Sequence, residues 1–231
     1  MADESRAVPI PARWPSVPYV LPFVLFLFLQ GLQSYLPFDV SVEYPLRLAL
    51  LAAALAIFSR GVIDLRCGAA LQTITVGIGV FVIWILPDVL FPAYRQHWIF
   101  QNPLVGWIGN NVPENILISP VVLWSRILRA SVVVPIIEEL FWRAWLMRWL
   151  ISPRFERVAL GAYRPAAFWA TAVLFASEHG PYWDVGLVAG IIYNWWMLRT
   201  KSLGDCILAH AVTNACLCIY VVATRHYEYW P

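Results

Sequence analysis

Two long apolar runs constrain the fold of this chain more than any other feature of its sequence. Residues 67–87 carry no formal charge, and residues 205–224 carry none after Asp205 at their start. About 20 helical residues cross a hydrocarbon core roughly 30 Å thick. The composition agrees, because 61% of the 231 residues are hydrophobic and 13% are charged. Soluble domains carry about 25% charged residues, so the sequence predicts a membrane protein.

Further apolar segments extend this prediction to an all-α, polytopic membrane protein. We expect about seven or eight transmembrane helices around a polar intramembrane cavity. The candidate spans lie near 19–36, 45–58, 67–87, 118–148, 165–179, 184–198 and 205–224.

Two parts of this pattern depart from simple crossings. The segment 118–148 is too long, so it must tilt, protrude or break, and Pro135 is the expected place for a break. The segments 165–179 and 184–198 measure only about 22 Å each as helices. We therefore expect the turn between them, at Gly180-Pro181, to lie partway through the membrane and to line a cavity.

The basic residues predict the orientation of the chain. If seven spans alternate, ten of the sixteen Lys and Arg residues fall on one side, and only Arg47, Arg95 and Arg225 fall on the other. This asymmetry predicts that the N-terminus lies in the cytoplasm. We expect the protein to be a multi-pass protein of the inner membrane. No signal-peptidase site follows the first apolar run, so we expect that span to be retained. We expect four parts, which are a cytoplasmic segment at 1–18, helices and an external loop at 19–117, a helical core at 118–224 and a tail at 225–231.

Three polar clusters interrupt the apolar segments, although a charge at the centre of a membrane helix costs roughly 2.5–3.5 kcal/mol. The first contains Glu138, Glu139 and Arg143. Glu139 and Arg143 share a helix face at a spacing of four and can form an ion pair. Glu138 points about 100° away and has no such partner. A desolvated carboxylate without a partner is a candidate general base, although all three groups could also reach water at a helix end.

The second and third clusters are centred on histidines. His179 ends a helix one turn after Phe175, where it could simply interact with the helix terminus. His210 and Asn214 share a face within the span 205–224. They could hydrogen-bond a neighbouring helix, or they could present two donors to a developing oxyanion. Together the clusters provide a base, an imidazole that orients water and a pair of donors, which is a set for hydrolysing an amide.

In their order and spacing these clusters resemble the three motifs of the CPBP family. The motifs read EExxxR at Glu138, Glu139 and Arg143, FxxxH at Phe175 and His179, and HxxxN at His210 and Asn214. This family contains the CAAX prenyl endopeptidases and bacterial Abi-type proteins. The resemblance covers roughly residues 118–220. The chain is also similar in its general look to the bacterial subgroup associated with exosortase systems, although no motif carries that likeness.

The resemblance implies the chemistry of a glutamate-type intramembrane endopeptidase. Glu138 would be the general base, His179 would hold the water, and His210 with Asn214 would stabilise the oxyanion. Glu139 would be structural, tied to Arg143. Members of the family were long treated as metalloproteases. Zinc stays open here, but no HExxH helix is present, and we favour no metal.

The partners expected are the lipid bilayer and a membrane-associated peptide or protein. A net charge of +2 gives no reason to expect nucleic acid. Arg126 and Arg129 lie on the same segment as Glu138 and could bind a carboxylate of the substrate. Alternatively they pair with acidic groups such as Glu114 or reach outward to water.

Two other functions fit part of this pattern. A catalytically silent relative would bind or shield a partner, as in immunity roles. A proton-coupled transporter would also carry intramembrane Glu and His, but it predicts inverted repeats, and we detect none. One geometric problem accompanies the protease hypothesis, because simple alternation of the spans places His179 and His210 towards opposite faces of the membrane.

Overall fold

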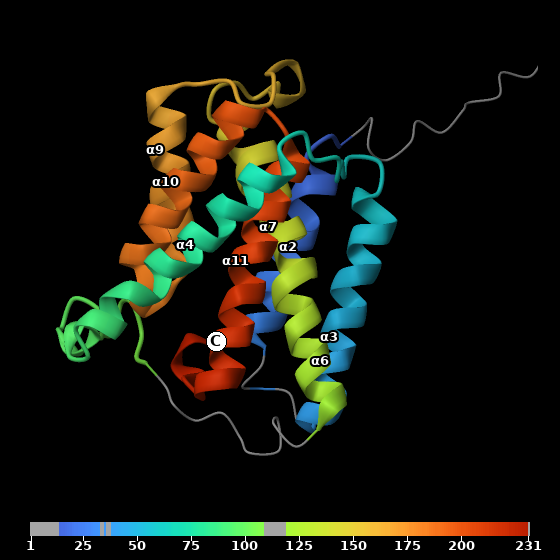
Figure 1. The fold of residues 1–231 in the computed structure, drawn as a ribbon. Helices are drawn as coiled ribbons and strands as arrows, with labels where there is room; N and C mark the ends of the chain where they lie inside the picture. The colour runs from blue at the N-terminus through green and yellow to red at the C-terminus, as the bar shows by residue number, and fades with distance from the viewer. Residues whose placement is uncertain (1–13, 33–34, 36–37, 109–118, 231) are drawn as a thin grey trace, which may run out of the picture.

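The computed structural model describes residues 14–32, 35, 38–108 and 119–230. Regular structure in this part of the chain is helical, apart from one isolated bridge between Asn102 and Gly106. Figure 1 shows the long helices packed side by side as a bundle. The helices are α2 (Val17–Gly31), α3 (Val40–Ala54) with its π-helical continuation η2 (Leu55–Ser59), α4 (Ala70–Leu90), α6 (Pro120–Leu128), η4 (Arg129–Val133), α7 (Val134–Glu139), η5 (Leu140–Leu146), α8 (Met147–Trp149), α9 (Pro165–Ser177), α10 (Trp183–Thr200) and α11 (Leu203–Thr224), and the 3₁₀ turns are η3 (Tyr94–Gln96), η6 (Phe155–Arg157), η7 (Gly180–Tyr182) and η8 (Tyr227–Tyr229).

Several of these helices are suited to a membrane. The four that are long and apolar enough to cross it are Val40–Ser59, Ala70–Leu90, Pro120–Trp149 and Leu203–Thr224. Two shorter apolar helices, α2 and α9, stand beside them. The prediction of an all-α membrane protein with several spans is therefore confirmed. The segment expected at 184–198 is longer than expected, since α10 has 18 residues.

The helix from Pro120 to Trp149 runs without interruption, so the expected break at Pro135 is wrong. The helix instead contains two π-helical turns, η4 and η5. At the end of η4, the N–H of Val134 donates to the carbonyl of Arg129, one residue further back than in an α-helix. Pro135 follows and has no N–H to donate. The carbonyl of Ala130 therefore receives no bond from Val134 or Pro135, and it needs a partner from elsewhere in the fold.

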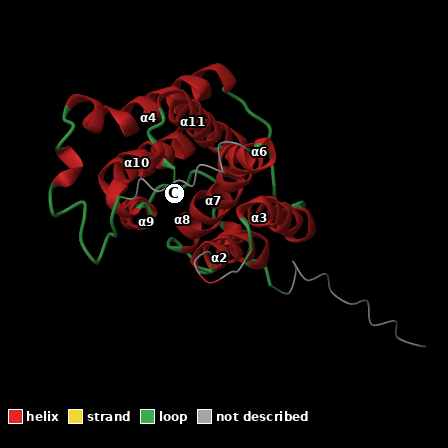
Figure 2. Cartoon of the chain, turned by 90° about the horizontal axis from the view of Figure 1, so that it is seen from below, coloured by secondary structure: helices red, strands yellow, loops and turns green. Residues whose placement is uncertain are grey.

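Helices α4 and α11 approach each other closely, and both views show them side by side (Figures 1 and 2). A Cβ atom at Gly77 of α4 would lie 2.5 Å from the carbonyl oxygen of Ala209 in α11. The hydroxyl of Thr213 donates to the carbonyl of Gly77 at 2.8 Å. One turn earlier in both helices, the buried Asp205 accepts hydrogen bonds from Gly68 and Ala69, just before α4, and from Thr73 in its first turn. These contacts fix α11, which carries His210 and Asn214, against α4.

The turn after α9 is held by a buried arginine from the loop that follows α4. Arg95 donates to the carbonyl of Pro181 at 2.7 Å and to the carboxylate of Asp184 at 2.8 Å. It also pairs with Asp88 at 2.9 Å. The external loop expected at the end of the part 19–117 is described only to residue 108, and this described part anchors the turn that carries His179.

Candidate active site

The three motifs converge on one cavity of about 190 Å³, although they lie on different helices. The predicted site residues among its lining are Glu138, His179, His210, Asn214, Phe175, Arg126 and Arg129. Phe175 connects the two histidines, because its ring centre lies 4.7 Å from that of His179 and 6.1 Å from that of His210. The apparent placement of the histidines towards opposite faces is therefore resolved in the fold. The helix α9 has only 13 residues, and His179 follows directly after it. The short helix therefore leaves His179 beside the same cavity that the His210 side chain lines.

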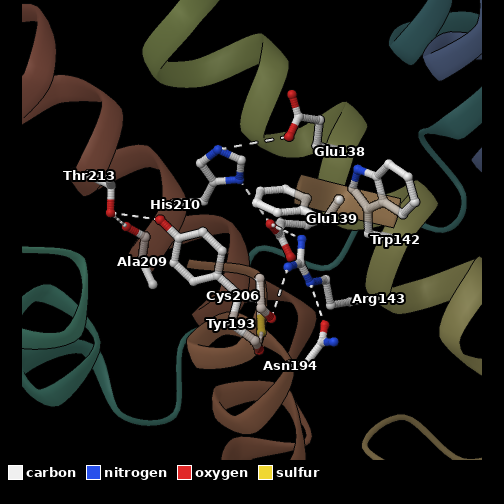
Figure 3. A network of polar contacts seen from close by, with 12 residues as sticks. Glu138, Glu139, Trp142, Arg143, Tyr193, Asn194, Cys206, Ala209, His210 and Thr213 are labelled. Atoms are coloured by element: carbon white, nitrogen blue, oxygen red, sulfur yellow. Dashed lines mark hydrogen bonds and ion pairs between the residues drawn. The ribbon is translucent and has the colours of Figure 1, made fainter. Parts of the chain in front are cut away.

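Glu139 and Arg143 form the predicted ion pair, and the pair extends to a histidine (Figure 3). One oxygen of Glu139 accepts from Arg143 Nη1 at 3.0 Å and lies 2.8 Å from Nδ1 of His210. Arg143 also donates to Asn194 at 3.1 Å, and its guanidinium lies 4.4 Å from the ring centre of Phe175. Glu139 and Arg143 are completely buried. A carboxylate paired with arginine can only accept, so Nδ1 of His210 carries the proton of this bond.

Glu138 lies on the same helix and has no comparable partner. It is 6% exposed, and its Oε2 atom accepts no hydrogen bond from the described residues. The Nε2 atom of His210 lies 4.0 Å from Oε2 of Glu138, at the limit of an ion pair (Figure 3). The sequence argument that separated the two glutamates thus agrees with their contacts. Glu139 is held by Arg143 and His210, while Glu138 faces the cavity.

The imidazole of His179 is held in one orientation. Its Nδ1 atom lies 2.7 Å from the carbonyl oxygen of Phe175, and a carbonyl only accepts. Nδ1 is therefore the protonated nitrogen, and Nε2 keeps a lone pair for another group. Trp84 packs edge-on against the ring at 5.2 Å, and a Cβ atom at Gly186 would approach the ring to 3.2 Å.

Asn214 supplies the missing partner for the π-helical turn. Its side-chain Nδ2 donates to the carbonyl of Ala130 at 2.9 Å. This is the carbonyl that Val134 and Pro135 leave without a bond. The alternative in which this face of α11 hydrogen-bonds a neighbouring helix therefore applies to Asn214. The amide has a second N–H proton, and Asn214 also lines the cavity.

The two arginines expected to bind a substrate carboxylate lie at the far end of the cavity from Glu138 along the long helix. Arg126 is 3% exposed and donates to the hydroxyl of Tyr44 at 2.7 Å and to the main-chain carbonyl of Trp230 at 2.5 Å. The guanidinium of Arg129 lies 5.7 Å from the ring centre of Tyr44, and its buried Nε has no hydrogen-bond partner among the described residues. Glu114, the alternative partner, lies outside those residues.

Three further cavity or wall residues were not singled out from the sequence. Glu178 lines the cavity, and its Oε1 atom accepts from the indole N–H of Trp142 at 2.9 Å. Tyr193 stacks on His210 with ring centres 5.1 Å apart and donates to Thr213 at 2.7 Å. Glu178 directly precedes His179, which was a signal in the sequence. Tyr193 and Trp142 are aromatic residues in apolar helices, and such residues carry no distinguishing mark before the fold is known.

The side chains do not fit a zinc site. Among the described residues, no group of three or more His, Cys, Asp or Glu side chains is placed to hold a metal ion. Nδ1 of His179 binds Phe175 and Nδ1 of His210 binds Glu139, so Nε2 is the ring nitrogen that each histidine keeps for another group. Zinc sites in proteins commonly need at least three protein ligands about 2.0–2.3 Å from the metal. We therefore derive no catalytic step through a metal.

Helices able to cross a membrane and a buried site of carboxylates and histidines define the class, an integral membrane protein with a polar site in its core. In a comparison with protein families, residues 120–216 match the family described as Type II CAAX prenyl endopeptidase Rce1-like. This confirms the CPBP resemblance and supports membrane protease activity in general terms. The matched stretch contains all three motifs. Comparisons with curated proteins and with solved structures found no match.

Proposed function

We propose that this protein is an intramembrane endopeptidase in which Glu138 activates water to hydrolyse a peptide bond. One observation carries the proposal. Glu138 presents a buried carboxylate oxygen without a hydrogen bond to a cavity that also contains His179, His210 and Asn214. A buried carboxylate without a hydrogen bond lowers the stability of the fold, so its presence indicates a functional role. Abstraction of a proton from water is a reaction that such a carboxylate can catalyse as a general base.

The orientation of His179 supports a role in holding this water. Because Nδ1 donates to Phe175, the Nε2 lone pair can accept one hydrogen of a water molecule, while Glu138 accepts the other. The water oxygen attacks the peptide carbonyl carbon and its proton passes to Glu138. Glu138 then gives that proton to the leaving nitrogen as the carbon–nitrogen bond breaks. The products are a carboxylic acid and an amine.

His210 and Asn214 are the proposed donors to the oxyanion. Asn214 has one amide proton beyond the one given to Ala130. His210 can donate from Nε2 only as an imidazolium, because its Nδ1–H already binds Glu139. The carboxylate of Glu139 would stabilise that cation. Glu139 is thus proposed to be a positioning residue that acts through His210, in addition to its structural pairing with Arg143.

The substrate class follows from the location of the site. The cavity lies among helices suited to a bilayer, so we propose a membrane-associated peptide or protein as the substrate. Arg126 and Arg129 offer guanidinium groups to an oxygen of that chain. We propose that the protein lies in the inner membrane with its N-terminus in the cytoplasm.

The test compares wild-type protein, Glu138→Gln and Glu156→Gln in cells and in reconstituted vesicles. Glu156 is exposed in η6, so its substitution controls for the loss of one carboxylate. We expect membrane peptides to accumulate uncleaved only with Glu138→Gln in a quantitative proteomic comparison. Normal cleavage by this variant would refute Glu138 as the base. A wild-type protein that retains a partner without any turnover would instead indicate a silent binding protein.

A further inference from the structure

The last described residues fold back into the cavity. The helix α11 ends at Thr224, and Arg225 adopts a left-handed conformation with φ 63°, which reverses the chain. The turn η8 then places Tyr229 and Trp230 in the cavity wall, where they are 5% and 7% exposed. Figure 1 shows this turn beside the end of α11. We call residues 226–230 the return segment.

Arg126 holds the return segment as it would hold a peptide. It donates from Nη2 to the main-chain carbonyl of Trp230, and its guanidinium lies 4.5 Å from the centre of the Trp230 rings. The first contact uses an atom that every peptide has, and the second requires an aromatic side chain. The indole lies in an apolar cluster with Cys218, Leu123 and Ile127. The Arg126 end of the cavity therefore has the features of a subsite for an aromatic residue.

The rest of the return segment is attached by few polar contacts. The hydroxyl of Tyr229 donates to Asp88 at 2.8 Å, and that of Tyr182 donates to the carbonyl of Glu228 at 3.1 Å. Asp88 also binds Arg95, which supports the turn after His179. These are hydrogen bonds and side-chain packing contacts, so a competing peptide can replace them one at a time.

We propose that the Arg126 end of the cavity is a subsite for an aromatic residue of the substrate, and that the return segment is its resident occupant. This inference rests on the proposed function. Arg126 and Glu138 are 12 residues apart on one helix, which is about 18 Å at 1.5 Å per residue. An extended peptide spans about 3.3–3.6 Å per residue, so the aromatic residue lies about five residues from the bond that is cut.

Kinetics with an internally quenched peptide test the competition. Trp230→Ala and the milder Tyr229→Phe weaken the return segment, while Glu156→Gln at an exposed position in η6 is the control. If the subsite of the wild-type protein is open about a tenth of the time, full displacement of the segment lowers KM about tenfold and leaves kcat unchanged. We expect a lower KM with the first two variants and no change with Glu156→Gln. An unchanged or raised KM for both would show that Trp230 is a fixed wall.

Binding of a synthetic peptide gives a readout that does not depend on turnover. The peptide has the sequence Arg-His-Tyr-Glu-Tyr-Trp of residues 225–230 and carries a photo-crosslinking group at its N-terminus. We expect it to label the Trp230→Ala protein more strongly than wild type, and to lose this labelling when its Trp is replaced by Ala. Equal labelling of both proteins, or none, would overturn the subsite. Strong labelling with no cleavage by any protein would instead contradict the proposed protease.

Discussion

The Nδ1 atom of His210 lies 2.8 Å from the oxygen of Glu139 that also accepts from Arg143. One buried carboxylate therefore serves an ion pair within its own helix and an imidazole from another helix. This joins the EExxxR motif to the HxxxN motif through a single oxygen atom. It also explains why the two glutamates, adjacent in the sequence, differ in their contacts, since Glu139 is paired and Glu138 faces the cavity.

The same substitution at these neighbouring glutamates should give opposite results. Glu138→Gln should reduce turnover about 10²–10⁴-fold, the usual contribution of a general base, and should leave stability unchanged or raised. Glu139→Gln removes the charge opposite Arg143 and should destabilise the protein by about 3 kcal/mol. Unfolding in detergent and peptide cleavage measure the two effects. Similar stability losses in both variants would contradict the distinction between them.

Asn214→Ala should lower stability by about 1–3 kcal/mol, because it leaves the partly buried carbonyl of Ala130 without a partner. The substitution Pro135→Ala restores a main-chain N–H, so the helix can return to α-helical pairing at this point. We therefore expect Asn214→Ala to cost less in a Pro135→Ala background. A double-mutant cycle of unfolding free energies checks this coupling. Additive effects would mean that Asn214 does not serve the π-helical turn.

Two glycines on α4 offer a matched pair for the packing against α11. Gly77→Ala would place a Cβ atom 2.5 Å from the carbonyl oxygen of Ala209, whereas a Cβ atom at Gly79 meets nothing within 4 Å. We expect Gly77→Ala to destabilise the protein by about 1–3 kcal/mol. Gly79→Ala should instead stabilise the helix by up to about 1 kcal/mol. Thermal unfolding of both variants measures these changes. Equal losses of stability would argue against the close approach of α4 and α11.

Removal of metal ions should leave cleavage unchanged. Among the described residues, His179 and His210 belong to no group of three or more His, Cys, Asp or Glu side chains that could hold a metal ion. We expect activity to survive dialysis against EDTA and 1,10-phenanthroline. Activity that disappears with both chelators and returns with zinc alone would require a different arrangement of these histidines.

Much of the fold was predictable from the sequence because charged residues are largely excluded from the hydrocarbon core, so membrane spans appear as long apolar runs. The apolar runs at 67–87 and 205–224 correspond to α4 and α11. The pair of Glu139 and Arg143 was predictable because both lie within one helix, where a spacing of four fixes their distance. The orientation in the membrane and the roles in catalysis remain predictions.

Features that depend on contacts between distant segments were not predictable. Pro135 predicted a break, but the fold inserts a π-helical turn whose unpaired carbonyl, at Ala130, is bound by Asn214, 84 residues away. His210 had no visible partner in its own helix, since Glu139 is 71 residues away. The expected tail at 225–231 gave no sign of Trp230 packing beneath Arg126. Such contacts depend on three-dimensional packing, on which local periodicity carries no information.

The π-helical turn η4 also changes how residue numbers translate into direction. In a regular α-helix, nine residues rotate by about 900°, so Arg129 and Glu138 would point to opposite sides. Both nevertheless line the same cavity. One extra residue in η4 accounts for about 100° of rotation. An α-helix with one residue fewer between these positions also rotates by about 800°. Deleting one residue from 130–133 would therefore leave the guanidinium and the carboxylate on the same side of the helix. The π-helical turn thus takes up one extra residue and keeps the direction of the side chains on either side of it.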